Sequence, residues 1–592
     1  MCGISGEVRF DNAPPQLDAV QKMSLVQEPR GPDGAGVFQT QNIAFAHRRL
    51  KVIDLSDHAA QPMVDSQLGL TIVFNGCIYN YRKIRAELET KNYSFFSTGD
   101  TEVLLKAWHA WGIEGIKRLQ GMFAFAIHER DSGRVILGRD RLGIKPLYVS
   151  QDSKRLRFAS TLPAILAGGG VNTDIDSTAL HHYLSFHSVV PAPHTLLQGV
   201  KKLPPATIRI IQSNGQQEDT EYWHLKYGTP SSMSDLTFND WKDLTLDALK
   251  TSVSRRLEAD VDVGVLLSGG LDSSLVVGLL SELGQKNLST YSVGFEAAGG
   301  ESGDEFEYSD IVANHFATQH HQITVSSSSL LPALSHCVQS MSEPMMSHDV
   351  IGFYLLSKEV SKGLKVVQSG QGADEVYGGY HWYPPLVDST DATADYAKVF
   401  FDRDHDEYLS MVQSDFHTSN HSLDFVKQRF ANSSNLSAVD KALDIDTRIM
   451  LVDDPVKRVD NMTMAWGLEA RVPFLDHELV ELAAQTPFKH KLAHDGKGIL
   501  KEAARSVIPH QVIDRPKGYF PVPALKYIEG EYLDFVKAIL HSPQSSAKTL
   551  FNPKYVQNLL ADPKAHITPL RGSKLWQIAM LDFWLQTHGV SA

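Results

Sequence analysis

Short apolar runs bounded by Gly, Asn or Asp recur through the first 210 residues of the chain. Runs of this kind are typical of buried strands that end in turns. Two stretches, 81–88 and 100–111, instead space their apolar residues along one face of a helix. Strands interrupted by two amphipathic helices predict stacked sheets covered by helices. The predicted strands are 43–47, 70–74, 123–127 and 134–137.

The pattern changes beyond residue 235, where apolar strands alternate with Gly-rich loops and helices. Strand 261–267 runs into the loop 268–274, which opens a compact helix. Two more strands follow at 290–295 and 365–368, and the second of them leads into another Gly-rich loop. This order predicts parallel strands joined by helices, with both loops opening into one crevice at the carboxyl ends of the strands.

A stretch rich in Gly, Pro and Ser lies between the two patterns at 226–235. Such composition is typical of a linker between domains. A chain of 592 residues is also too long for a single core. We therefore expect an α+β domain of stacked sheets at 2–214 and an α/β domain at 235–592.

Composition narrows the classes of function. The net charge of -13 gives no electrostatic reason to bind nucleic acid or an anionic membrane. Cys2, Cys77 and Cys337 are scattered, which indicates neither a disulfide framework nor a zinc site. We see no secretion signal and no apolar stretch of membrane-spanning length. We therefore expect a cytoplasmic protein that acts on small molecules and not on nucleic acid or membranes.

Cys2 is the first candidate for chemistry, because it becomes the N-terminal residue once Met1 is removed. It then carries a thiol with a pKa of ~8.5 and an α-amine with a pKa of ~8 on the same carbon. One residue can thus supply both a nucleophile and a base. The alternative is a cysteine without a catalytic role.

Residues that suit a free α-amino acid accompany Cys2 in this half of the chain. Asn75 and the Gly76 N–H are candidates for an oxyanion hole, although a single Asn-Gly is more often a hairpin turn. Arg49 can bind a carboxylate with two parallel hydrogen bonds, and Asp100 can hold an ammonium. The alternative for Arg49 and Asp100 is ordinary surface charge.

The loop 268–274 reads Ser-Gly-Gly-Leu-Asp-Ser-Ser between a strand and a helix. This arrangement points backbone N–H groups at an anion, and three serines add hydroxyl donors. The second loop, 369–375, also carries acids. Asp272 and Asp374 could therefore share a Mg²⁺ ion that bridges phosphates, and the alternative is that both acids cap helices.

The first half resembles the class II glutamine amidotransferases, which are N-terminal-nucleophile hydrolases of αββα fold, and most closely the glutaminase domain of asparagine synthetase B. The matching segments are Cys2-Gly3-Ile4, Arg30-Gly31-Pro32-Asp33, Ala46-His47-Arg48-Arg49-Leu50, Phe74-Asn75-Gly76 and Gly138-Arg139-Asp140-Arg141-Leu142-Gly143. The resemblance implies that Cys2 attacks the side-chain amide of glutamine and releases ammonia, with Asn75 and Gly76 as the oxyanion hole. It implies a glutamine site formed by Arg49, Leu50, Lys51, Val52, Ile53, Asn75, Gly76, Cys77 and Asp100.

The second half resembles the PP-loop synthetases, which cleave ATP to AMP and pyrophosphate, and the order of the two halves is that of asparagine synthetase. Further matches are Gly467-Leu468-Glu469-Ala470-Arg471-Val472-Pro473-Phe474-Leu475-Asp476 and Gly496-Lys497-Gly498. The resemblance implies Mg²⁺ on Asp272 and Asp374 and a catalytic role for Lys497, for which the alternative is a solvated lysine. It implies ATP contacts from Leu267, Ser268, Gly269, Gly270, Leu271, Asp272, Ser273, Ser274, Val293, Ser369 and Gly370.

Some positions depart from the pattern of asparagine synthetases. Cys77 replaces a glutamate that helps to hold the glutamine ammonium, and Gln371 replaces a glutamate of the second loop. Met345 and His348 stand where a Thr and an Arg hold aspartate. Together with the run 379–385, these residues look more like the N-acetylglutaminylglutamine amidotransferases, which make an osmolyte dipeptide amide. We therefore favour the C-terminal carboxylate of that acylated dipeptide as the acceptor, with L-aspartate as the alternative. A homodimer is possible.

Overall fold

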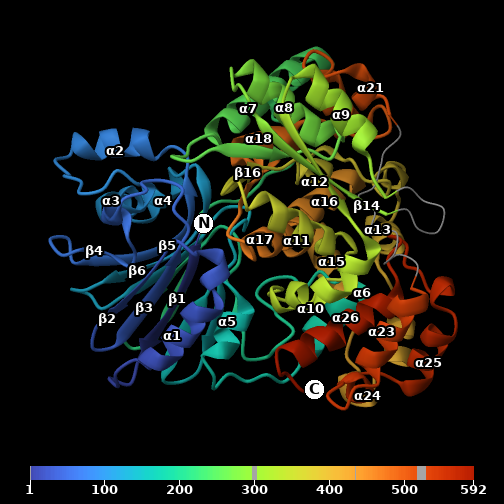
Figure 1. Cartoon of the computed structure of the whole chain (residues 1–592), viewed down its shortest axis with the longest axis horizontal. Helices are drawn as coiled ribbons and strands as arrows, with labels where there is room; N and C mark the ends of the chain where they lie inside the picture. Colours follow the sequence, from blue (N-terminus) through green and yellow to red (C-terminus); the bar gives the residue numbers. More distant parts are fainter. Residues whose placement is uncertain (1, 297–302, 434, 516–527) are drawn as a thin grey trace.

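The computed structural model describes residues 2–296, 303–433, 435–515 and 528–592. The chain builds two antiparallel sheets from its first part and one parallel sheet from its second (Figure 1). Within the described ranges, none of the helices combines the length and apolar character that crossing a bilayer requires.

The first part contains two six-stranded sheets stacked face to face. In spatial order, the first sheet consists of β10 (Lys201–Lys202), β8 (Tyr148–Gln151), β9 (Arg155–Ala159), β1 (Cys2–Arg9), β3 (Ile43–Arg49) and β2 (Gly34–Gln39). The second sheet consists of β12 (Gln217–Glu221), β11 (Thr207–Ile211), β7 (Val135–Arg139), β6 (Gly121–Glu129), β5 (Leu70–Ile78) and β4 (Met63–Asp65).

Helices cover the outer face of each of these sheets, while apolar side chains such as Ile4, Phe45, Val73 and Leu137 fill the space between them. On one side lie α1 (Leu17–Val26) and α5 (Leu162–Ala167); on the other lie α2 (Tyr81–Glu89) and α3 (Asp100–Trp111) (Figure 1). This is the αββα arrangement that the resemblance implies, and it confirms the prediction of stacked sheets covered by helices.

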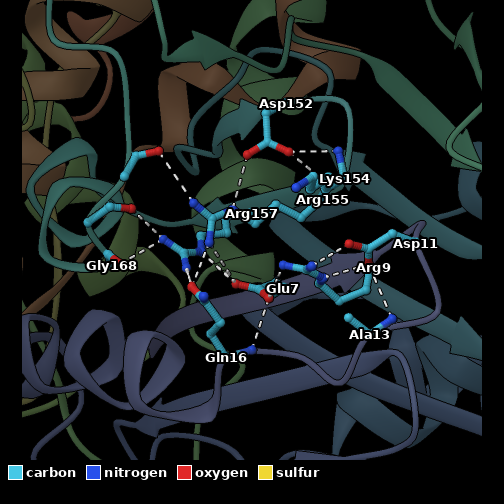
Figure 2. Close-up of polar contacts among 12 residues, drawn as sticks. Glu7, Arg9, Asp11, Ala13, Gln16, Asp152, Lys154, Arg155, Arg157 and Gly168 are labelled. Carbon is cyan, nitrogen blue, oxygen red and sulfur yellow. Dashed lines mark hydrogen bonds and ion pairs between the residues drawn. The ribbon is translucent and has the colours of Figure 1, made fainter.

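A buried ion pair between the two central strands of the first sheet also holds the residue that precedes α1 (Figure 2). The Arg157 Nε on β9 donates to Glu7 Oε2 on β1 at 2.7 Å, and both side chains are almost fully buried. The Gln16 N–H donates to the other oxygen of Glu7 at 2.9 Å. Burial of this carboxylate is tolerated because its charge is paired and its oxygens are hydrogen-bonded.

The second part is built on a five-stranded sheet in which every pair is parallel. Its strands are, in spatial order, β15 (Gln319–Val325), β14 (Ser289–Phe295), β13 (Val263–Leu266), β16 (Val366–Gln368) and β17 (Glu469–Arg471). The sequence predicts three of them. The other two escape the hydrophobic pattern because β15 exposes much of its length and β17 has only three residues.

Separate apolar cores lie on the two faces of this sheet. The helices α7 (Phe238–Arg255), α8 (Leu271–Glu282), α18 (His477–Gln485) and α20 (Gly498–Ala504) belong to one core, while α11 (Asp349–Val360) and α17 (Lys457–Met464) belong to the other. β13 lies between β14 and β16, so the later strands are added on both sides of it. The strand order therefore reverses at β13, and its carboxyl end is a topological switch point.

The remaining α-helices lie in both parts of the chain: α4 packs beside α3 in the first part, and most of the others belong to the second (Figure 1). They are α4 (Ile113–Lys117), α6 (Ser177–Ser185), α9 (Phe306–His315), α10 (Leu330–Gln339), α12 (Ala373–Tyr377), α13 (Ala392–Phe400), α14 (His405–Met411), α15 (His421–Ala431), α16 (Ala438–Ile445), α19 (Phe488–Leu492), α21 (His510–Ile513), α23 (Gly530–Leu540), α24 (Ala547–Leu550), α25 (Pro553–Ala561) and α26 (Lys574–Thr587).

Buried ion pairs join the two parts of the chain. Asp460 on α17 accepts from Arg30 Nη1 at 2.9 Å and lies 3.1 Å from Lys145 Nζ, and all three side chains are at most 5 % exposed. Lys202 makes a similar contact with Asp453, at 2.8 Å. Because buried charges are stable only when paired, these contacts fix how the two parts sit against each other.

Candidate functional site

Cys2 is the first described residue and begins β1, where it pairs with Arg49 of β3. Its backbone N–H donates to Asn75 Oδ1 at 3.0 Å. The Asn75 Nδ2 is buried and has no hydrogen-bond partner among the described residues. A buried amide N–H₂ beside a thiol is a ready donor for an oxyanion. Burial raises the pKa of the Cys2 thiol, and the Leu50 N–H and the Arg49 guanidinium offset part of that rise.

Asn75 and Gly76 lie inside β5 and pair with Ala124 and Phe123 of β6. The expectation that they follow the strand as a loop or hairpin turn is therefore wrong. Pairing with β6 outweighs the local preference of Asn-Gly for a turn. A Cβ at Gly76 would lie 2.2 Å from the Met122 carbonyl oxygen, so only glycine fits there.

Arg49 is buried at the end of β3 and is not a surface charge. Its Nη1 donates to the Ser56 carbonyl oxygen at 2.8 Å, and its Nη2 donates to that of Asp54. These neutral partners orient the guanidinium without neutralising it. Of the predicted neighbours, Leu50 and Val52 are buried against Val366 of the second part, Ile53 is half-buried, and Lys51 extends to the exposed Asp57.

Asp100 is also buried, as the first residue of α3, and its Oδ2 accepts from the Ile78 N–H at 2.9 Å. Burial raises the pKa of this carboxyl to about 6. Cys77 lies two residues beyond Asn75 on β5, and therefore on the same face of the strand. The structure thus brings Cys2, Arg49, Asn75, Cys77 and Asp100 to one region, which we call the Cys2 pocket.

Residues of the second part also reach this pocket. The sequence by itself predicted no role for them in the Cys2 pocket. The Arg471 Nη2 on β17 donates to Cys77 Sγ at 3.6 Å, and its Nε pairs with Glu469 at 2.6 Å. From the first part, the Arg30 Nε donates to the Cys2 carbonyl oxygen at 3.2 Å. The signal was present only as the matching runs 30–33 and 467–476.

A second site lies at the switch point of the parallel sheet. A cavity of about 270 Å³ opens where β13 and β16 end side by side. Most of the predicted nucleotide residues line it, whereas Gly269 and Ser274 lie behind the lining. The lining set comprises Leu267, Ser268, Gly270, Leu271, Asp272, Ser273, Val293, Ser369 and Gly370. The Ser268 N–H donates to Ser273 Oγ at 3.2 Å, which closes the loop on itself.

Lys497 joins the two acids of this cavity. Its Nζ lies 2.6 Å from Asp272 Oδ2 and 2.9 Å from Asp374 Oδ1, and only 9 % of the side chain is exposed. Lys497 is therefore not a solvated lysine, and the two carboxylates raise its pKa although burial opposes them.

The two converging carboxylates also fit the predicted Mg²⁺, because hard oxygen ligands are those that Mg²⁺ prefers. In the described part of the chain, however, no group of three or more His, Cys, Asp or Glu side chains is arranged to hold a metal ion. Asp272 and Asp374 would thus need phosphate oxygens to complete a magnesium site.

Of the residues that the sequence connects with the choice of acceptor, some line this cavity and others do not. Gln371 and Asp349 line it, together with Glu375 and Tyr380. Met345 is buried in a core cluster and does not line it, and neither does His348. Arg458 on α17 pairs with Asp349 at 2.9 Å and lies behind the cavity wall. This part of the cavity lining is thus acidic and aromatic.

Both parts of the chain match known families. A family model described as asparagine synthase matches residues 244–586, and one described as glutamine amidotransferase domain matches residues 1–223. Asparagine synthetase (glutamine-hydrolyzing) 1 of Bacillus subtilis is 30% identical, over 99% of this chain and 96% of its own length. Asparagine synthetase (glutamine-hydrolyzing) 3 of the same organism is 29% identical, over 95% and 93%. Asparagine synthetase B of Escherichia coli K12 is 28% identical, over 88% and 82%.

Proposed function

Because the chain belongs to the glutamine-hydrolysing asparagine synthetase family, we propose that it amidates L-aspartate. Members of this family are carbon–nitrogen ligases, and so is this chain. Ammonia from glutamine would be released at Cys2 and delivered to a carboxylate activated by ATP in the second site. The similar relatives are named asparagine synthetases, which favours aspartate over the acyl dipeptide that the sequence motifs suggest.

One observation carries the proposal: a buried nucleophile with an oxyanion donor and a Gly-rich nucleotide cavity occur in one chain, joined by buried ion pairs. At Cys2, the sulfur would attack the amide carbon of glutamine while Asn75 Nδ2 stabilises the oxyanion. The α-amine exposed by removal of Met1 would accept the thiol proton and pass it to the departing ammonia. Water would then hydrolyse the thioester to glutamate.

In the second site, the aspartate β-carboxylate would attack the α-phosphorus of ATP, and pyrophosphate would leave. The loop 268–274 would bind the phosphates through backbone N–H groups and serine hydroxyls. Magnesium held by Asp272 and Asp374, when bound, would neutralise charge on the leaving pyrophosphate. Lys497 would act on the same developing charge, and ammonia would then displace AMP from the acyl-adenylate to form the amide.

The C-terminal carboxylate of N-acetylglutaminylglutamine is the second candidate acceptor. It is favoured by the sequence at Met345 and His348, which stand where a Thr and an Arg hold aspartate in asparagine synthetases.

Pyrophosphate release from the full-length enzyme with glutamine and MgATP distinguishes the two acceptors. We expect release with aspartate and formation of asparagine. Release with the acyl dipeptide alone would replace aspartate by that substrate, and ADP formation or no release with either would overturn the proposal. The Cys2→Ala variant should lose the glutamine-dependent reaction and keep the reaction with added ammonia.

A further inference from the structure

Four buried charges from both parts of the chain surround the Cys2 pocket: the guanidiniums of Arg49 and Arg471 and the carboxylates of Asp100 and Glu469. Arg49 and Asp100 contact only neutral backbone groups among the described residues, with no ion pair within 4 Å. Each therefore lacks a counter-charge that a bound ligand could supply. A zwitterionic amino acid would supply one charge of each sign.

Glu469 extends this set of charges from the second part. It lies on β17, is 1 % exposed, and its Oε1 accepts from Arg471 Nε at 2.6 Å. The same guanidinium donates to Cys77 Sγ at 3.6 Å, so the carboxylate lies one side chain away from β5. Burial alone would raise the pKa of Glu469, but the positive charge of the chain's terminal amine and then that of Arg471 lower it to about 2, and Glu469 remains ionised.

The charge of Glu469 reaches the residues that would bind and cleave glutamine. Burial is the main cause that raises the pKa values of Cys2, Cys77 and Asp100, and the negative charge of Glu469 raises all three further. Asp100 and Glu469 are thus two carboxylates that repel each other in one buried region. A ligand cation that comes near both carboxylates would be stabilised by both negative charges.

Arg471 holds Glu469 in place by more than the ion pair. Its Nη1 donates to the carbonyl oxygens of Arg256 and Glu258, each at 2.9 Å, and the guanidinium lies over the Tyr79 ring at 5.5 Å. A guanidinium fixed by four different groups orients the carboxylate that it pairs with. The position of Glu469 is therefore set before any ligand binds.

We propose that Glu469 of the second part is a glutamine-recognition residue, which binds the α-ammonium of glutamine together with Asp100. The proposal rests on the proposed function of the Cys2 pocket as a glutaminase. It assigns to β17 the negative charge that Cys77, a neutral thiol, does not provide from β5. The glutamine site would then be complete only when the two parts are docked.

The Glu469→Gln variant of the full-length enzyme tests whether Glu469 binds glutamine, and glutamate formation is the readout. Loss of a charged hydrogen bond to the ligand should raise the KM for glutamine at least about tenfold, with little change in kcat. Pyrophosphate formation with added ammonia should stay within about twofold of the wild type. The matched control is Glu7→Gln, which breaks another buried Glu–Arg pair, that with Arg157 inside the first part, and should leave the KM for glutamine unchanged.

Because Glu469→Gln leaves Arg471 without its counter-ion, the variant can lose stability, and a second variant covers that case. Glu469→Gln with Cys77→Glu returns a carboxylate beside Arg471 from the other strand, and it should lower the KM for glutamine again to within a few fold of the wild type. Cys77→Ser in the same background adds no charge and should not rescue.

The proposal is overturned if the KM for glutamine stays within twofold in Glu469→Gln. It is equally overturned if the double variant folds without rescue, or if ammonia-dependent and glutamine-dependent activities fall together, since that outcome marks a structural role. Failure to find any acceptor would remove the proposed synthetase function but not this result, because glutamate formation is measured without an acceptor.

Discussion

At the scale of single residues, burial converts ordinary side chains into the chemistry of the Cys2 pocket. The Asn75 side chain is fully buried, so water does not reach its amide nitrogen, which has no hydrogen-bond partner among the described residues. The charges of Arg49 and Asp100 are not neutralised by their neighbours, because the groups that they contact are neutral. The residue types could be read from the sequence, whereas their protonation and readiness to bind depend on this burial.

Asp100 gives a pH dependence that follows from its raised pKa of about 6. In the proposed glutamine site, the ammonium of glutamine would need the ionised carboxylate of Asp100, which is the main form above that pH. As pH falls through about 6, we expect kcat/KM for glutamine to fall, approaching tenfold per pH unit below it, because the free-enzyme pKa sets this profile. A pH series of glutamate formation measures the effect. For Asp100→Asn, we expect a low kcat/KM for glutamine whose pH profile has no inflection near pH 6. An unchanged inflection in this variant would exclude Asp100 as its source.

At the scale of elements, the nucleotide site depends on two loops that follow adjacent parallel strands. The registry of β13 with β16 places the loops 268–274 and 369–375 against each other. A Cβ on Gly370 would lie 2.9 Å from both the Asp272 Cβ and the Ser273 nitrogen. The two loops can therefore approach only because one of them carries glycine at this point.

Gly370→Ala should force the loops apart and weaken ATP binding. Overpacking of this kind costs about 1–3 kcal/mol, so we expect the KM for ATP to rise roughly tenfold. Pyrophosphate formation at varied ATP measures it, and glutamate formation at Cys2 should be unaffected. Gly363→Ala is the control, because its added Cβ would meet only Tyr291 Oη, at 3.5 Å. Equal effects of the two substitutions would show that the contact with the 268–274 loop is not the cause.

At the scale of the whole molecule, charges that are far apart in sequence hold the two parts together. Asp460 accepts from Arg30 and contacts Lys145 with almost no access to water. Arg30 also donates to the Cys2 carbonyl oxygen, so the junction and the nucleophile share one side chain. Docking of the two parts and geometry of the Cys2 pocket are therefore linked.

Asp460→Asn should destabilise the protein strongly, since it leaves two buried cations without their anion. Breaking a buried ion pair costs about 3–5 kcal/mol, and we expect a clear drop in the thermal midpoint. Arg209→Gln removes the pair of Arg209 with the 41% exposed Asp219 and should cost at most about 1 kcal/mol. Calorimetry of both variants measures the difference between their thermal midpoints. Similar midpoints would mean that the ion pairs of Asp460 stabilise the protein no more than an exposed pair does.

The sequence alone determined what depends on local spacing and residue type. The apolar periodicity of 100–111 is that of α3, and the runs at 70–74 and 123–127 lie in β5 and β6. Stacked sheets covered by helices and a parallel α/β part follow from such patterns, because periods of two and 3.6 residues are set by the backbone itself; the αββα order is what the family resemblance implies. The Cys2 motif and the 268–274 loop likewise carry the resemblance to the family that the whole-chain matches show.

Only the tertiary structure decided which distant residues share a site. Arg471 and Cys77 are 394 positions apart and meet only because β17 packs beside the Cys2 pocket. Strand pairing with β6 placed Asn75 and Gly76 inside a strand, where the local signal favoured a turn. The physical reason is the same in both cases: burial and long-range pairing set the protonation and partners of a side chain, and neither is encoded by its immediate neighbours in the chain.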